Sequence, residues 1–162
     1  MSIRHIQEKD LPTILEIYND AILNTTATYK YEVQTLAEKQ QWLKNLYAQG
    51  YNGFVYEIQG KVVGFANYSK FREYTAYKYT VENSVYLHQD YRGQGIGSKL
   101  LDVLVEDASQ KGFAAMISVI DVDNQVSQAL ARKKGFQYVG TLKRVGYKFD
   151  RWLDAAIYQK ML

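Results

Sequence analysis

The segment Arg92-Gly93-Gln94-Gly95-Ile96-Gly97-Ser98 is the part of the sequence whose residue types most clearly serve chemistry. It follows the apolar run Val85-Tyr86-Leu87 and precedes apolar residues at helical spacing, so the glycines lie between the end of a strand and the start of a helix. Such a turn exposes backbone N–H groups at the positive end of a helix dipole, which suits the phosphates of a ligand. Three alternating glycines beside an arginine exceed what an ordinary turn needs, so the segment predicts a polyphosphate site.

Two nucleotide-binding patterns contain similar glycines, and both fit this segment poorly. A P-loop requires Gly-Lys followed by Ser or Thr, whereas the order here is Gly97-Ser98-Lys99. The dinucleotide-binding fingerprint needs its third glycine where Ser98 stands, and it needs an acidic ribose partner about twenty residues later. The glycines therefore predict a phosphate chain that neither nucleotide pattern describes well.

Periodic apolar residues predict the elements around this segment. Helical spacing predicts helices that begin near Asp10, Thr35, Ile96 and Asn124. Asp10 is expected to cap the first of them, and Thr35 with Glu38 is expected to form a capping box at the second. Alternating or continuous apolar runs predict strands over 3–6, 54–58, 62–66, 79–87, 114–120, 136–145 and 152–161. The helix that begins at Ile96 is the crossover between two strands, and a crossover of this kind joins parallel strands. The order of elements and the length predict a mixed α/β fold, with a mostly antiparallel sheet flanked by helices, in one domain over residues 1–162.

The composition excludes several classes of protein. The chain has no cysteine, which excludes disulfides, thiolate metal sites and a cysteine nucleophile. His5 and His88 lack the helical spacing of a zinc pair, so no metal site is predicted. The chain does not open with a basic segment and an apolar run, and it has no apolar stretch of membrane length, so we expect a cytoplasmic protein. The net charge of +3 is too small to indicate a nucleic-acid partner, although it favours an anionic cofactor.

The glycine segment resembles the pyrophosphate loop of the GNAT acetyltransferase superfamily, whose pattern Arg/Gln-x-x-Gly-x-Gly/Ala matches Arg92-x-x-Gly95-x-Gly97. Asn124-x-x-Ser127 followed by Lys133-Lys134-Gly135-Phe136 is similar to the second cofactor segment of that superfamily. The segments 24–28, 80–87 and 146–154 resemble one subfamily, the phosphinothricin and methionine-sulfoximine N-acetyltransferases. The resemblance implies a GNAT fold, acetyl-coenzyme A (acetyl-CoA) as the acetyl donor, and a homodimer.

Acyl transfer from a thioester to an amine requires a deprotonated amine, a polarised carbonyl and a thiolate that can leave. Glu82 lies in an otherwise uncharged strand directly before the glycine segment, and the resemblance implies that it removes the ammonium proton by way of water. Without the resemblance, a carboxylate facing solvent on an alternating strand explains Glu82 equally well. The resemblance therefore predicts that Glu82 is the catalytic base.

The resemblance also implies which residues hold the acetyl donor. In the superfamily the backbone of the strand that carries Val85 and Leu87 binds the pantetheine arm, while the two side chains pack in the core. Asn124 is implied to contact the pantetheine region, although the cap of a helix is an equally good explanation of this asparagine. The predicted cofactor contacts are Val85, Tyr86, Leu87, Arg92, Gly93, Gln94, Gly95, Ile96, Gly97, Ser98, Asn124 and Lys133.

Charged and aromatic residues around the strand of Glu82 predict the acceptor site. Arg72 can bind both oxygens of a carboxylate because its guanidinium is planar. Lys78 precedes the strand and Lys148 lies in the C-terminal segment, although a solvated surface charge is the more common fate of a lysine. Tyr74 and Tyr29 are among the tyrosines that can line a small pocket or a dimer surface. The basic residues favour an anionic acceptor over a cationic one.

Position 131 departs from the superfamily pattern. The wider superfamily often has a tyrosine there as general acid, and the subfamily commonly has a histidine, but this chain has Ala131. The pKa of a free thiol is about 8.5, so the thiolate can leave with little help, or water or another tyrosine can assist.

The leading prediction is an N-acetyltransferase that acts on the amino group of a small amino acid or analogue, of the phosphinothricin or methionine-sulfoximine type. A GNAT enzyme that acts on polyamines, aminoglycosides or protein N-termini is an alternative. A third reading is a non-catalytic sensor of acyl-CoA, for which Ala131 is the only support.

Overall fold

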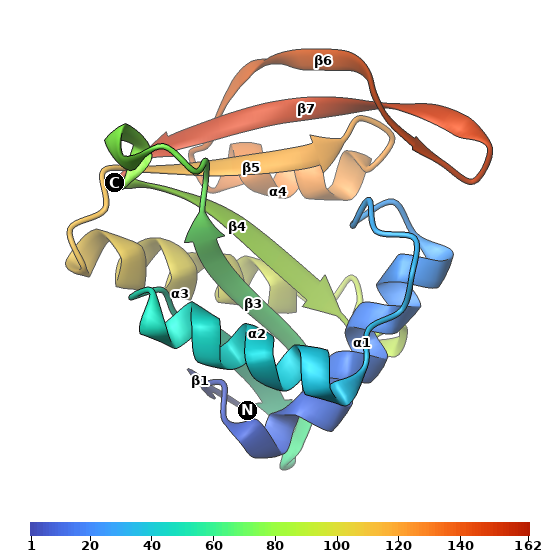
Figure 1. Cartoon of the computed structure of the whole chain (residues 1–162), viewed down its shortest axis with the longest axis vertical. Coiled ribbons are helices and arrows are strands. Elements are labelled where there is room, and N and C mark those ends of the chain that lie inside the picture. The colour runs from blue at the N-terminus through green and yellow to red at the C-terminus, as the bar shows by residue number, and fades with distance from the viewer.

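The computed structural model describes residues 1–162, and its seven strands form one sheet in the order β1-β2-β3-β4-β5-β7-β6 (Figure 1). The strands are β1 (Ser2–His5), β2 (Gly53–Ile58), β3 (Lys61–Lys70), β4 (Thr80–Leu87), β5 (Ala115–Asp121), β6 (Gln137–Lys148) and β7 (Arg151–Met161). The helices are α1 (Leu11–Asn24), α2 (Leu36–Ala48), α3 (Ile96–Gln110) and α4 (Gln125–Lys133). Only β4 and β5 pair in parallel, so the predicted mixed α/β fold with a mostly antiparallel sheet is confirmed.

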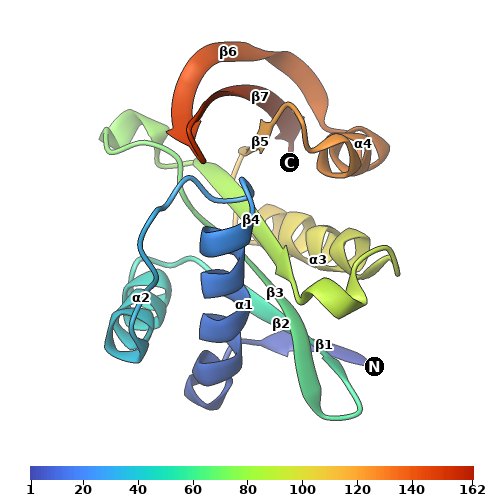
Figure 2. The same cartoon turned by 90° about the vertical axis from the view of Figure 1, so that its right-hand side faces the viewer.

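The helices cover both faces of the sheet. α1 and α2 lie on one face, whereas α3 lies on the other face, across β2, β3 and β4 (Figure 2). α4 lies on the same side as α3 and packs against β5 and β6. Ile14 and Ile22 of α1 and Leu100 and Leu104 of α3 are fully buried, as the helical spacing of these apolar residues predicts. The sheet is therefore held between two apolar helix surfaces.

The helix starts depend on different capping groups. Thr35 Oγ1 accepts from the N–H of Glu38, and the Glu38 carboxylate accepts from Thr35 N–H, so the predicted capping box of α2 is confirmed. Asp10 was expected to cap α1, and this expectation is wrong, because its side chain makes no cap hydrogen bond there. The Asp10 carboxylate instead binds the guanidinium of Arg4 through two hydrogen bonds of 2.8 Å. Asp10 thus ties the start of α1 to β1.

The two parallel strands part after three residues. Thr80, Val81 and Glu82 of β4 pair with residues 115–117 of β5, and the pairing ends there. β4 then follows β3, while β5 remains paired with β7 as far as Asp121, so the two strands diverge (Figure 1). The divergence leaves one edge of β4 without a neighbouring strand.

The C-terminal strands β6 and β7 form a long hairpin that curves over the far edge of the sheet (Figure 2). The register of the hairpin shifts between Leu142 and Gly146, and Arg144 in this bulge has a φ of +55°. β6 extends to Lys148, three residues beyond its predicted end, and β3 likewise runs on to Lys70. No helix of the chain is both long and apolar enough to span a membrane.

Candidate active site

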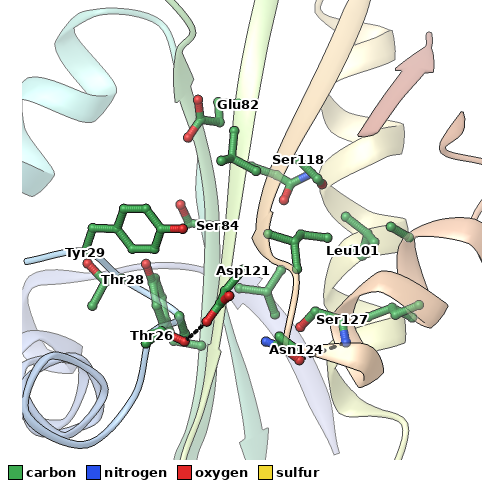
Figure 3. A pocket seen from close by; sticks show the side chains of 18 residues that line it. Thr26, Thr28, Tyr29, Glu82, Ser84, Leu101, Ser118, Asp121, Asn124 and Ser127 are labelled. Atoms are coloured by element: carbon green, nitrogen blue, oxygen red, sulfur yellow. Dashed lines mark hydrogen bonds between the residues drawn. The ribbon is translucent and has the colours of Figure 1, made fainter. Parts of the chain in front are cut away.

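A cavity of about 330 Å³ occupies the gap between β4 and β5. Its walls are residues 82–86 of β4, residues 118–121 of β5, the loop residues 26–29 after α1, and parts of α3 and α4 (Figure 3). Because no hydrogen bonds join the two strands here, side chains from both faces of the sheet line the cavity. Two ligands can therefore meet in it from opposite faces of the sheet.

The polar side chains in the cavity divide between these faces. Glu82 pairs with Ile117, and side chains alternate along a strand, so Asp121 lies on the same face as Glu82. Asn83 and Ser118 lie on the opposite face, where α3 and α4 pack. We name the first side the Glu82 face and the second the α3 face.

The open edge of β4 presents backbone hydrogen-bonding groups to the cavity. His88 N–H donates to Val63 O at 2.9 Å, which marks a hydrogen-bonded pair of β3 and β4. Hydrogen-bonded pairs alternate along an antiparallel ladder, so Tyr86 also turns its N–H and C=O toward β3. Val85 and Leu87 turn theirs toward the open edge. An extended chain of amides can bind this edge as an added strand would.

The glycine segment joins β4 to α3 and lies at one end of the open edge. Gly93 and Gly95 have φ of +74° and +79°, a left-handed conformation that favours glycine. Gly95 is the N-cap residue of α3, and it has no side chain to satisfy the N–H groups of the first turn. A Cβ at Gly97 would lie 3.7 Å from Leu130 and 3.8 Å from Leu87, so the first turn of α3 sits close to α4 and β4. These exposed N–H groups fit a pyrophosphate.

The carboxyl group of Glu82 lies in the cavity on its own face (Figure 3). Burial raises the pKa of Glu82 above the ordinary value of a carboxyl group, and the positive charge of Arg72 lowers it in part. A carboxylate whose pKa is raised toward neutrality is a better proton acceptor than a solvated one. Glu82 therefore has the position and the basicity to accept a proton from an amine.

The loop that follows α1 is held against the cavity by β6. Lys148 is buried, and its ammonium group donates to the backbone oxygens of Thr25 and Thr28, both at 2.7 Å. The ring of Tyr29 packs on Gly146, where a Cβ would come within 2.6 Å of the ring. The sequence left two interpretations of Lys148, a charge that binds the acceptor and a solvated surface charge. Both are wrong, because its buried ammonium group is hydrogen-bonded to the loop backbone.

The sequence profile described as "Acetyltransferase (GNAT) domain" matches residues 3–157. The chain belongs to the GNAT acetyltransferase family. It is 42% identical over 159 residues to the L-methionine sulfoximine/L-methionine sulfone acetyltransferase of Pseudomonas aeruginosa, covering 98% of this chain and 92% of that protein.

Solved structures of this GNAT family agree in fold. A phosphinothricin acetyltransferase from Sinorhizobium meliloti in complex with acetyl-CoA has a TM-score of 0.96 and 40% identity, with 99% of this chain and 88% of that chain covered. A ribosomal-protein-alanine N-acetyltransferase from Brucella melitensis has a TM-score of 0.99 and 43% identity, with both chains fully covered. The chain is thus an acetyl-CoA-dependent N-acetyltransferase, which confirms the predicted enzyme class and acetyl donor.

Three residues predicted for the acceptor lie outside the cavity walls. Arg72 is exposed and its guanidinium donates to the backbone oxygen of Phe71 at 2.8 Å, while its positive charge lowers the pKa of Glu82. Tyr74 is 79% exposed and contributes nothing to the cavity wall. Lys78 is also exposed, with its ammonium group 5.1 Å from the ring centroid of Tyr79. The structure brings only Arg72 of these three near the predicted base.

The residues predicted for the donor separate into several groups. Asn124 lines the cavity and also caps α4, since its Oδ1 accepts from Ser127 N–H at 3.1 Å, so both explanations hold. Tyr86 also lines the cavity, but its backbone faces β3 and its ring packs against Tyr18 on the Glu82 face. The Ile96 side chain is buried in the core, which leaves only its N–H for a ligand.

The other polar residues predicted to bind acetyl-CoA lie in the glycine segment, in the first turn of α3 or at the end of α4. Arg92 is half exposed, and its nearest acidic partner is Asp20 at 3.9 Å. Gln94 donates to the backbone oxygen of Asp90 at 3.4 Å, which closes the turn. Ser98 lies in the first turn of α3, and Lys133 is exposed at the last turn of α4. The basic side chains of Arg92 and Lys133 are thus exposed to solvent, where they can reach the phosphates of a ligand.

Sequence reasoning missed the polar residues that β5 places in the cavity. Asp121 is only 5% exposed, accepts a hydrogen bond from Thr26 Oγ1, and lies 3.8 Å from the guanidinium of Arg151. Ser118 lines the α3 face. The available signal was the presence of polar residues within a strand that is otherwise a continuous apolar run.

Proposed function

We propose that the chain transfers the acetyl group of acetyl-CoA to the amino group of a small amino acid or amino-acid analogue, of the methionine-sulfoximine or phosphinothricin type. The observation that carries this proposal is the cavity between β4 and β5. The open edge of β4 can bind acetyl-CoA in this cavity, and Glu82 lies on the other face of the sheet as the base. The names of the Pseudomonas aeruginosa and Sinorhizobium meliloti relatives support the acceptor class.

The residues of the chain divide the work of this reaction. When bound, acetyl-CoA supplies a thioester whose carbonyl carbon the amine attacks. The N–H groups of the first turn of α3 hold the pyrophosphate, and the N–H and C=O groups of Val85 and Leu87 bind the pantetheine amides along the open edge. An N–H group of the same edge is positioned to polarise the thioester carbonyl. Glu82 removes the proton from the acceptor ammonium on the opposite face.

The acceptor is recognised on the Glu82 face. The cavity volume of about 330 Å³ is shared with the end of the donor, which leaves room for an acceptor of amino-acid size. The guanidinium of Arg72, whose charge acts on Glu82, is suited to the carboxylate of an amino acid, with which it can form two hydrogen bonds. A polyamine or an aminoglycoside has no such carboxylate, and its added positive charge would meet Arg72.

A thiol-release assay with acetyl-CoA tests this assignment. Methionine sulfoximine, phosphinothricin, the standard amino acids, an alanine-terminated peptide and spermidine are compared as acceptors. We expect turnover with the amino-acid analogues, and an increase in their KM of about tenfold in Arg72→Gln, with no change in Lys44→Gln, which removes an exposed charge on α2. Activity confined to spermidine or to the peptide would overturn the acceptor class, and donor binding without any turnover would favour a sensor.

We also propose that the enzyme is a homodimer that pairs through the outer surface of the β6–β7 hairpin. β6 is an edge strand, and apolar side chains cluster on the hairpin with about half of their surface exposed: Tyr138, Val139, Leu142, Val145 and Trp152. An exposed apolar edge strand of this kind favours association. Sedimentation of wild type as a monomer at micromolar concentration would contradict the dimer, whereas a dimer that Val145→Asp dissociates would support it. The cytoplasmic location remains a prediction.

A further inference from the structure

Asn83 and Ser118 lie at the point where β4 and β5 part. The last pair of the two strands is Glu82 with Ile117, and at the next position Asn83 Nδ2 donates to Ser118 Oγ at 2.6 Å. The side chains thus continue the connection by one residue after the backbone pairing has ended. This hydrogen bond lies on the α3 face at the narrow end of the cavity, where the two strands begin to part. We call this end the apex.

The hydroxyl group of Ser118 retains a hydrogen to donate. Ser118 is 4% exposed, and its oxygen has no hydrogen-bond partner in the chain other than Asn83. A serine hydroxyl accepts and donates, so acceptance of the Asn83 hydrogen leaves its own O–H available. Ser118 lines the cavity, and the cavity is therefore where this O–H finds an acceptor.

No other hydroxyl group lies at this end of the α3 face, where the other polar side chain, Asn83, donates to Ser118. The wall here is completed by Leu101, Ile120, Leu130 and Ala131, which are apolar. The second hydroxyl on this face belongs to Ser127, which lies with Asn124 at the start of α4, at the other end of the cavity from Glu82 (Figure 3). Ser118 instead stands directly across the sheet from the base.

We propose that Ser118 is a catalytic residue that donates a hydrogen bond to the sulfur of coenzyme A as the thioester breaks, and that Asn83 is the positioning residue for its hydroxyl. The proposal rests on the proposed function, because the sulfur must lie at the apex for the carbonyl to face an amine beside Glu82. As the bond between nitrogen and the acetyl carbon forms, the bond between carbon and sulfur breaks, and its electron pair stays on sulfur.

The proton balance needs no further reagent. The nitrogen loses two protons on the way to the amide. Glu82 takes the first from the ammonium group, and the second passes from the tetrahedral adduct to solvent. The thiolate takes a proton from solvent when coenzyme A leaves. Since the pKa of a free thiol is about 8.5, the thiolate needs stabilisation by a hydrogen bond rather than a strong acid. Ser118 keeps its own proton throughout the step.

Titration of the thiol of bound coenzyme A tests the proposal without turnover. The ultraviolet absorbance of the thiolate is followed against pH, with the complex of desulfo-coenzyme A as the blank. A hydrogen bond to the thiolate favours the ionised form, so we expect the ionisation constant to fall about tenfold in Ser118→Ala. Ser109→Ala, at an exposed site on α3, is the matched control and leaves the constant unchanged. Equal thiol pKa values in wild type and Ser118→Ala would overturn the proposal.

Kinetics separate the roles of the two residues. We expect Ser118→Ala to lower kcat about 10- to 100-fold with little change in the KM for acetyl-CoA, and Ser118→Thr to recover part of the loss. Asn83→Ala should cause a smaller loss, and none in the Ser118→Ala background, because it acts through the hydroxyl. A larger effect of Ser127→Ala on kcat and on the thiol titration would refute the assignment.

The two proposals fail in different ways. If wild type binds coenzyme A but acetylates none of the amino acids, the proposed acceptor fails, while the titration still decides whether Ser118 contacts the sulfur. If the amino acids are acetylated and the thiol titration is unaffected by Ser118→Ala, only the role of Ser118 fails. Circular dichroism of each variant confirms that the fold is retained.

Discussion

Lys39 on α2 gives a stability prediction whose size follows from its surroundings. Its ammonium group lies 3.8 Å from the ring centroid of Tyr18 and 4.2 Å from that of Trp42, and the side chain is 3% exposed. Burial, together with the charge of Lys30, lowers the pKa of Lys39 from 10.5 to about 7. No carboxylate pairs with the buried charge. The substitution Lys39→Met keeps the length of the side chain and removes the charge.

The sign and size of the effect follow from linkage. The unfolded chain holds a proton on Lys39 up to about pH 10.5, whereas the folded chain holds it only up to about pH 7. Below pH 7 the lysine is charged in both states, so the cost of burying the charge lowers the free energy of unfolding by its full amount. At about 1.4 kcal/mol for each pKa unit, the ceiling on this cost is about 5 kcal/mol. Each aromatic contact with the buried cation returns about 1–2 kcal/mol. We therefore expect Lys39→Met to be more stable than wild type by about 2 kcal/mol near pH 6.

Urea unfolding at several pH values measures this difference. The stability of wild type should rise toward that of Lys39→Met between about pH 7 and about pH 10, as the unfolded state comes to hold the extra proton. Lys44→Met, at an exposed position on the same helix, is the control and should match wild type at each pH. A Lys39→Met protein that is less stable than wild type near pH 6, or a difference that does not change with pH, would refute the reasoning.

Three further substitutions test the walls of the active site. Gly95→Ala strains a residue with φ of +79° and adds a methyl group to the pyrophosphate loop. The Kd for acetyl-CoA, measured by calorimetry, should therefore rise at least about tenfold. An unchanged Kd would contradict the role of the loop. Gly146→Ala pushes the ring of Tyr29, which lies 2.6 Å from the added Cβ, so KM for the acceptor should rise while the Kd for acetyl-CoA stays constant. Lys148→Met frees the backbone oxygens of Thr25 and Thr28, so proteolysis in the loop over residues 25–31 should accelerate; protection equal to wild type would argue against the anchor.

The elements of the fold were largely predictable because their signals are local. The helical spacing of Ile14 and Ile22, the capping box of Thr35 and Glu38, and the glycine segment after β4 each lie within one turn or one strand of the feature they predict. The exact ends were less certain, because β3 and β6 continue wherever a neighbouring strand offers hydrogen bonds. Asp10 shows a further limit, since its partner Arg4 lies on another element.

The cavity itself was not predictable from local signals. The point where β4 and β5 part depends on which backbone pairs form across more than thirty intervening residues, and no pattern in either strand states it. Glu82 was found through a resemblance, whereas Asp121 and Ser118 became visible only when the register placed them beside it. Lys148 was misjudged for the same reason, because its partners lie in the loop after α1. The structure also gives a physical reason for Gly146, which leaves room for Tyr29.

We propose that Glu82 takes the proton of the acceptor amine and that the acetyl group reaches this amine through the gap between β4 and β5. The pH dependence of kcat/KM for acetylation of methionine sulfoximine, measured for wild type and Glu82→Gln, tests it most directly. Because burial raises the pKa of Glu82, the acid limb of wild type should lie above the usual carboxyl range, and Glu82→Gln should lose that limb and about 10²- to 10⁴-fold in rate. A Glu82→Gln enzyme with full turnover and an unchanged profile would contradict the claim.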